Sequence, residues 1–435
     1  MKNTFILPLL AFAVATLAGP VQAESMRLQA NKAGDLSASA LRPAVVAPWQ
    51  NDNRDRVAVS YALDMDAPLA LNAKPEPVES REYWRKVSGT ELNRGIDLPT
   101  TAPGAMLRVS AQSSFGQAQK NAVLIEPEGL LLRSPQGREQ SLSASANSLY
   151  QAAKDEPAAL PVLRGGVAAK LDADLGAGVF QLKAKTAVAD DTEYLIQVFE
   201  PASPYRLQSK HRSHTVLAGN SLDVDGVLMR DGVAIAAKSA SATLLTPDGR
   251  RLPLDVRRGK NSSWHIAQAL DLPSGDAPGL WEVEWTLKAE HNGFAIERQV
   301  RSAFAFAAAS ARLERTVDVS KSANALRLSV PVTVASPGRY EVRAVISGKD
   351  AAGMVRPVAF AATAEWIESG RKAVTLQLDK QLLHDAGVTG PLYIQDLQLT
   401  DQSRLAILHK QAQALTLSEQ QWRGQSRQRE LNDRR

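Results

Sequence analysis

The sequence predicts an all-β protein of three consecutive β-sandwich domains, the second and third immunoglobulin-like, with a few short helices. The first observation is that short segments of alternating apolar and polar residues recur along most of the chain, separated by turns rich in Gly, Pro, Asn and Asp. The second is the segment Leu280–Lys288, whose alternation places Trp281 and Trp285 on the same face. Because two indole rings bury a large apolar area, we expect this face to anchor a sandwich core.

The chain opens with the features of a signal peptide. Lys2 precedes an apolar run from Phe5 to Leu17, and the residues up to Ala23 fit a small-residue cleavage site. The run is too short to cross a bilayer as a helix. We therefore expect a signal peptide at residues 1–23, cleavage after Ala23, and a mature protein in the periplasm or outside the cell.

Composition narrows the classes of function. The 435 residues include no cysteine, which excludes disulfides, thiolate metal sites and a thiol nucleophile. The net charge of +5 is scattered, aromatic residues make up 5% of the chain, and no basic block is interleaved with aromatics, so nucleic-acid binding is not expected. The length allows about three domains with a core each.

Residues 24–80 are predicted to form a mostly irregular lead-in, because prolines interrupt them repeatedly. One strand is expected at Val57–Leu63, where alternate apolar residues share a face. Ser80 is a candidate N-cap for a short helix over Glu82–Val87 that ends at Gly89.

The first β-rich domain is predicted over residues 81–204. Its last strand is apolar on much of both faces and should be central in its sheet. A helix is expected over Ser143–Lys154, and the Pro-containing segment Glu200–Pro204 marks the end of the domain. The expected strands are Met106–Val109, Ala122–Ile125, Leu130–Leu132, Val179–Leu182 and Tyr194–Phe199.

Two immunoglobulin-like modules are predicted next, over residues 205–313 and 314–418. In the third module Asp379 is expected to cap a short helix that ends at Gly387. Residues 419–435 should form a polar, basic tail, helical or disordered. Strands of the second module are expected at Ser213–Leu217, Ser221–Met229, Val233–Leu245, Leu252–Val256, Trp264–Leu270, Leu280–Lys288 and Phe294–Phe306. Those of the third are Leu326–Val334, Arg339–Ser347, Val355–Trp366, Ala373–Leu378, Leu392–Leu399 and Leu405–Leu417.

The histidines offer few catalytic or metal-binding patterns. His211 and His214 lie three apart in a basic stretch without a nearby third ligand, so we expect a surface loop there. His384 and Asp385 are neighbours on a short helix, where adjacent residues do not face each other. His409 alternates with apolar residues and should be packed or at a sheet edge.

Paired aspartates raise the question of calcium, but none continues into a calcium-binding loop. Asp223 and Asp225 alternate with Leu222 and Val224, which places them on the solvent face of a strand. The other pairs are Asp64 with Asp66, Asp172 with Asp174, and Asp190 with Asp191.

No nucleophile elbow, zinc-protease motif, phosphate loop or dinucleotide fingerprint is present in the sequence. Gly176 and Gly178 indicate a turn. We assign no catalytic, cofactor-binding or metal-binding residue and expect no cofactor. Tryptophans outside the predicted core could make surface contacts, although partial burial is expected; they are Trp49, Trp84, Trp264 and Trp366.

The order of these features resembles an uncharacterised family of exported gammaproteobacterial proteins of unknown function. The similarity runs from Tyr83 to Leu417. It rests on Glu82-Tyr83-Trp84, Pro103-Gly104-Ala105, the strand and exit at Tyr194–Ser203, and the ending at Asp396–Leu417. The resemblance implies an exported architecture with a first β-rich domain followed by two further β-modules, and it brings no catalytic residues.

Three functions remain open from the sequence. The leading hypothesis is a non-catalytic exported protein whose modules present edges and loops to a partner protein or envelope polysaccharide. The second is a periplasmic or secreted hydrolase with a dispersed site in the first domain or at the seam near His211 and His214. The third is an accessory factor or inhibitor of an exported protease.

Overall fold

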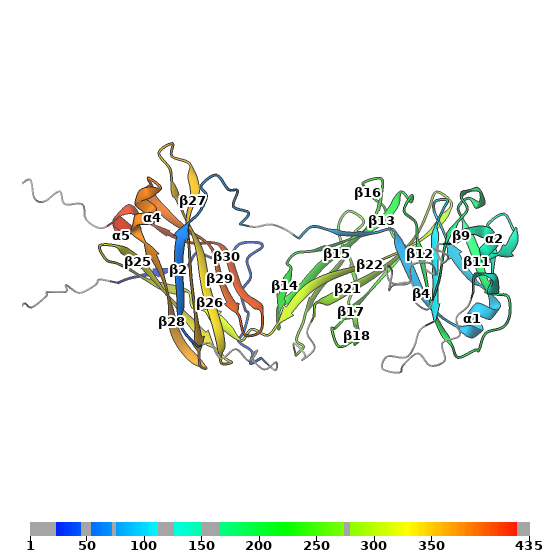
Figure 1. Ribbon diagram of the computed structural model, residues 1–435, viewed down its shortest axis with the longest axis horizontal. Helices are drawn as coiled ribbons and strands as arrows, with labels where there is room; N and C mark the ends of the chain where they lie inside the picture. The colour runs from blue at the N-terminus through cyan, green and yellow to red at the C-terminus, as the bar shows by residue number, and fades with distance from the viewer. Residues whose placement is uncertain are drawn as a thin grey trace, which may run out of the picture.

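The computed structural model describes residues 23–44, 54–71, 75–111, 126–148, 166–273 and 279–423. Its elements are almost all strands, which confirms the predicted all-β class. Figure 1 shows an elongated molecule in which three β-rich parts follow one another along the long axis. Each part encloses a separate cluster of buried apolar side chains, named here the first, middle and C-terminal cores.

The first core lies between two sheets. One has the order β4-β12-β6-β10-β9 and the other the order β5-β11-β7-β8. β12 lies between β4 and β6, which confirms the prediction of a central strand. The elements are β4 (Glu82–Ser88), α1 (Gly89–Arg94), β5 (Ile96–Pro99), β6 (Met106–Ala111), a 3₁₀ turn at Pro127–Gly129, β7 (Leu130–Arg133), β8 (Glu139–Ser141), α2 (Leu142–Ser145), β9 (Ala146–Ser148), β10 (Gly166–Leu171), a 3₁₀ turn at Ala173–Leu175, β11 (Val179–Ala184) and β12 (Glu193–Phe199).

The middle core confirms the role predicted for the indole pair. Trp281 and Trp285 are 2% and 0% exposed and lie in this core. Gly226 on the opposing sheet packs directly on the indole of Trp285, since a Cβ at Gly226 would lie 2.9 Å from that ring. The elements are β13 (Tyr205–His211), β14 (Thr215–Leu217), β15 (Ser221–Arg230), β16 (Val233–Ala234), β17 (Ser239–Leu245), β18 (Arg251–Leu254), β19 (Arg257–Arg258), β20 (Trp264–Ala269), β21 (Trp281–His291) and β22 (Phe294–Ala307).

The sheets of the first and middle parts are continuous. The order β18-β17-β21-β22 continues into β4 through the pairing of Gln299 with Glu82. The facing sheet of the middle part has the order β19-β20-β15-β13-β3, where β3 (Val78–Ser80) is its last strand.

The C-terminal core also lies between two sheets, β1-β24-β25-β23 with β28, and β2-β27-β26-β29-β30. Asp379 caps α4 as predicted, because its carboxylate accepts a hydrogen bond from the Gln381 amide (2.9 Å). α5 contributes the buried Trp422 to this core. The elements are β23 (Ala311–Leu313), β24 (Thr316–Lys321), β25 (Ala325–Val334), β26 (Gly338–Lys349), β27 (Val355–Ile367), β28 (Gly370–Asp379), α4 (Lys380–Asp385), β29 (Thr389–Asp401), β30 (Ala406–Leu417) and α5 (Glu419–Arg423).

The N-terminal lead-in is more ordered than predicted. The strand expected near Val57 is confirmed as β2 (Val57–Ala62), which pairs with β27 and lies beside it in Figure 1. In addition, β1 (Glu24–Arg27) pairs with β24, and β3 pairs with β13. These pairings join segments far apart in the sequence, so the local pattern did not reveal them.

Two predicted helices are wrong where the structure describes them. Glu82–Val87 forms strand β4, whose alternation buries Tyr83 and Val87 against the first core. The helix begins one turn later, because Ser88 and Glu91 form a reciprocal capping box. In the other segment α2 spans only Leu142–Ser145 and β9 follows at once.

Other differences are smaller. The expected strand Val233–Leu245 is divided into β16 and β17, and strand β13 was not predicted. The expected strand Ala122–Ile125, Trp49 and the end of the Ser143–Lys154 helix lie outside the described residues. No helix among the described residues has the length and apolar character needed to cross a membrane.

Candidate binding groove

A surface groove of about 340 Å³ lies where the first and middle parts of the chain meet. This volume is within the range of ligand pockets in proteins. Strands β3, β4, β12 and β22, which come from three distant parts of the sequence, form its walls. The lining residues are Val78, Glu79, Ser80, Glu82, Trp84, Leu195, Gln197, Val300 and Arg301.

The apolar part of the groove centres on Trp84. Its indole is half-buried, and the Arg301 guanidinium lies 4.8 Å from the ring centroid in a cation–π contact. Val78 adds an aliphatic side chain whose residue is 41% exposed. Trp84 was among the tryptophans that the sequence left open as surface contacts, and the structure places it in the groove.

The charged side chains of the groove already have partners within the protein. Glu79 pairs with Arg206 (3.1 Å). Glu82 accepts a hydrogen bond from Gln197. Arg301 pairs with the carboxylate of Glu284 (2.7 Å), which is itself buried. Glu79 and Arg301 are therefore ion-paired, whereas the partner of the Glu82 carboxylate is an uncharged amide.

Strand β3 presents its edge to the groove. Its three consecutive residues all line the groove, whereas side chains on one face of a strand alternate. Only the side of the strand can expose three successive residues, and β3 is the last strand of its sheet. Among the described residues, its backbone groups form ladder bonds with β13 alone.

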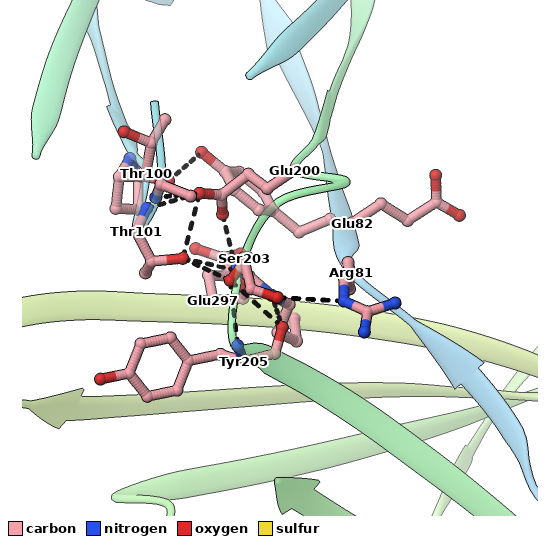
Figure 2. A network of polar contacts seen from close by, with 12 residues as sticks. Arg81, Glu82, Thr100, Thr101, Glu200, Ser203, Tyr205 and Glu297 are labelled. Atoms are coloured by element: carbon pink, nitrogen blue, oxygen red, sulfur yellow. Dashed lines mark hydrogen bonds and ion pairs between the residues drawn. The ribbon is translucent and has the colours of Figure 1, made fainter. Parts of the chain in front are cut away.

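A buried ion pair holds the two parts together beside the groove. The Arg298 guanidinium and the Glu200 carboxylate lie 2.6 Å apart, and both side chains are almost inaccessible to solvent. The same guanidinium donates to Thr101 Oγ1 and Ser203 Oγ (both 2.8 Å). Figure 2 shows Thr101, Glu200 and Ser203 converging at this point.

This network reaches the groove walls through the backbone. Arg81, next to the lining residue Glu82, donates to the Ser203 carbonyl (3.0 Å) and points toward it in Figure 2. The Trp84 amide donates to the Gln299 side chain (3.0 Å), which joins β4 to β22. Hydrogen bonds therefore connect the walls of the groove to the buried ion pair and to each other.

The prediction that His211 lies in a surface loop is wrong. His211 ends β13 and is 6% exposed, with its Nε2 atom 2.7 Å from Ser302 Oγ. Burial lowers the pKa of His211 from 6.5 to about 4. His214 is exposed and does not join it. The missed signal was the alternation that begins at Tyr205, whose odd-numbered residues are all buried.

The Ser302–His211 pair has the spacing of a nucleophile and its base, but it lies inside the sandwich. Ser302 is 1% exposed and also contacts Ser209 Oγ (2.7 Å). His211 Nδ1 has no hydrogen-bond partner among the described residues, so no acid orients the imidazole as in a catalytic triad. A substrate has no access to this serine in the folded chain.

The remaining candidates form no site. Asp223 and Asp225 lie on the outer face of β15 as predicted, and both contact His265, at 3.3 and 2.8 Å. His384 and Asp385 are exposed on α4 and lie 3.6 Å apart (Nδ1 to Oδ1), although these neighbours were not expected to face each other. His409 is packed in β30 as expected. Within the described ranges, no cluster of three or more His, Asp or Glu residues could hold a metal ion.

The fold and the groove define a class: multi-domain, all-β proteins with a groove at the seam between two sandwiches. Residues 48–200 match the N-terminal domain, and residues 310–418 the C-terminal domain, of the domain of unknown function DUF4785. Together these matches cover more than half of the chain, which belongs to the DUF4785 family. The predicted resemblance to a family of unknown function is confirmed to this extent, while export remains a prediction.

A solved structure from this family has the same fold. The crystal structure of a DUF4785 family protein from Legionella pneumophila is similar with a TM-score of 0.68 and 21% identity, over 88% of this chain and 98% of that one. At this identity the similarity shows the fold alone. No curated protein matches the chain.

Two other solved structures match less well. The native conformation of E. coli alpha-2-macroglobulin has 13% identity and a TM-score of 0.28, over 73% of this chain and 20% of that one. A tetra-tandem repeat of a large adhesion protein has 11% identity and a TM-score of 0.17, over 73% and 66%. Scores this low support no inference about this chain.

Proposed function

We propose that the protein is exported and non-catalytic, and that it binds a partner protein or a cell-envelope polymer in the groove around Trp84. The observation that carries this proposal is the groove itself. It combines a half-buried indole, polar side chains with partners inside the protein, and a strand edge near the buried Arg298–Glu200 ion pair. Sites of this kind select ligands by shape and by a few polar contacts.

Export is supported by the charged and apolar start of the chain. The predicted cut after Ala23 would leave β1, which begins at Glu24, intact in its pairing with β24. Cell fractionation followed by mass determination tests this part: we expect a periplasmic or secreted chain beginning at Glu24. A full-length chain in the cytoplasmic fraction would contradict it.

The binding role can be tested by affinity capture. The mature chain is immobilised and exposed to periplasmic extract and solubilised envelope material from the producing cells. We expect captured molecules that are lost with Trp84→Ala and retained with Trp264→Ala. Trp264 is a matched control, because it is also half-buried under an arginine, Arg258 (4.7 Å). Equal capture by both variants would refute the groove as the site.

The hydrolase hypothesis now rests on one contact, Ser302 Oγ with His211 Nε2. Both groups are enclosed, so activity would require the sandwich to open. Screening ester, peptide and glycan substrates against the wild type and Ser302→Ala separates the two proposals. Turnover that disappears with Ser302→Ala would favour the hydrolase.

A further inference from the structure

We propose that the groove binds an extended, uncharged peptide segment of a partner protein, which adds a strand to the free edge of β3. This inference rests on the proposed binding function and names the ligand class. The main observation in its support is that the edge strand β3 and several apolar side chains line the same groove.

The strand edge supplies the main-chain recognition. An unpaired edge offers N–H and C=O groups that an incoming strand can satisfy. β3 pairs with β13 on one side, and all three of its residues line the groove. A segment in the groove would therefore extend the six-stranded sheet by one strand.

The register of β3 predicts the side-chain pattern of the ligand. Val78 and Ser80 lie opposite Ser209 and Leu207, which are both fully buried, so these residues define the inner face. Glu79 lies opposite Gln208 and defines the outer face. Alternate ligand side chains would point inward and the others toward solvent.

The groove also contains apolar side chains. Val78, Leu195 and the indole of Trp84 line it, while Val300 is 2% exposed and belongs to the middle core. Inward-pointing ligand residues should therefore be aliphatic or aromatic, because they would leave water for an apolar surface.

Charge complementarity favours an uncharged segment over an anionic or cationic polymer. Two of the three charged side chains that line the groove, Glu79 and Arg301, are ion-paired within the protein, and Glu82 accepts a hydrogen bond from the neutral Gln197. A charged polymer would meet at most one lining carboxylate, Glu82, whose partner is uncharged, so most of its charges would displace existing ion pairs or remain unpaired. A neutral strand makes its polar contacts through the backbone and avoids this cost.

The first test uses phage-displayed random dodecapeptides as the probe and the mature full-length chain as the target. We expect selected sequences to alternate apolar and polar residues without net charge. A synthetic peptide of the selected sequence should bind Val78→Lys and Trp84→Ala at least about tenfold more weakly than the wild type. The matched controls Val233→Lys, at an exposed valine (68%) of a hairpin, and Trp264→Ala should keep the affinity within about twofold.

The second test addresses the backbone. A strand in a ladder uses the N–H groups of alternate residues on each side. Methylating the backbone nitrogen at one alternate set of peptide positions should abolish binding, and methylation at the other set should leave it nearly unchanged. Equal effects at all positions would refute strand addition.

Other outcomes separate this inference from the proposed function. Neutral envelope glycans that bind in a Trp84-dependent manner, without any selected peptide, would overturn the peptide inference and support the groove as a binding site. If neither peptides nor glycans bind in a way that depends on Trp84 or Val78, both proposals are overturned.

Discussion

Replacing His211 with glutamine is expected to make folding stability less sensitive to acid. Burial lowers the pKa of His211 from 6.5 to about 4 in the folded chain. As the pH falls below the unfolded value, the unfolded chain takes up a proton and the folded chain does not. The contribution of neutral His211 to stability is therefore complete above pH 6.5, the unfolded pKa, and is lost progressively as the pH falls to about 4, the folded pKa.

The size of the effect follows from the two pKa values of His211, 6.5 and about 4. Each pKa unit corresponds to about 1.4 kcal/mol, so the full loss is about 3 kcal/mol and the loss near pH 5 is about 2 kcal/mol. Burial also lowers the pKa of His409, so acid reduces stability through this residue too. His211→Gln does not remove the contribution of His409. The comparison is therefore between variant and wild type.

Urea denaturation followed by tryptophan fluorescence, at about pH 7.5 and about pH 5, measures this difference. The wild type should lose about 2 kcal/mol more than His211→Gln between the two conditions. His384→Gln, at an exposed position, should behave as the wild type. Equal losses in His211→Gln and the wild type would refute the assignment of a buried neutral imidazole.

Three further predictions concern the cores and the joint. Trp285→Ala should lower the free energy of unfolding by about 3–5 kcal/mol, because it leaves a cavity in the middle core. Gly226→Ala should lower it by about 1–3 kcal/mol, because the added methyl group would press against the indole of Trp285. Urea denaturation measures both losses, and a loss below about 1 kcal/mol for both variants would contradict this packing. Arg298→Ala should lower the free energy of unfolding by about 3–5 kcal/mol, because it leaves the buried Glu200 carboxylate without its ion-pair partner. The Arg298→Met/Glu200→Gln double variant should recover part of this loss. If the double variant is less stable than Arg298→Ala, the pairing argument fails. Ser302 should resist a fluorophosphonate probe in the native chain, as judged by mass spectrometry, and labelling would show that the sandwich opens.

Local patterns predicted most strands but misassigned two positions for identifiable reasons. The segment Glu82–Val87 contains residues compatible with either a helix or a strand, and pairing with β12 decides for a strand. His211 sits beside charged and polar residues that suggest a loop. Its burial depends on β22, which brings Ser302 against it from far along the chain.

The candidate groove was not predictable as a site. Trp84 could be named from the sequence as an open surface contact, but nothing local places it beside Val78 and Arg301. The segment Glu200–Pro204 was predicted to mark the end of the first domain. Its buried ion pair with Arg298 was not, because the partner comes from a different strand of the middle part.

The sequence by itself determined the all-β class, the inward face that carries Trp281 and Trp285, and the Asp379 cap, since each follows from the spacing of a few neighbouring residues. The tertiary structure alone decided that β1, β2 and β3 become edge strands of distant sheets, and that an open edge lies in a groove. The physical reason is that side-chain alternation sets which face of a strand is buried, whereas its neighbours are set by long-range pairing and packing.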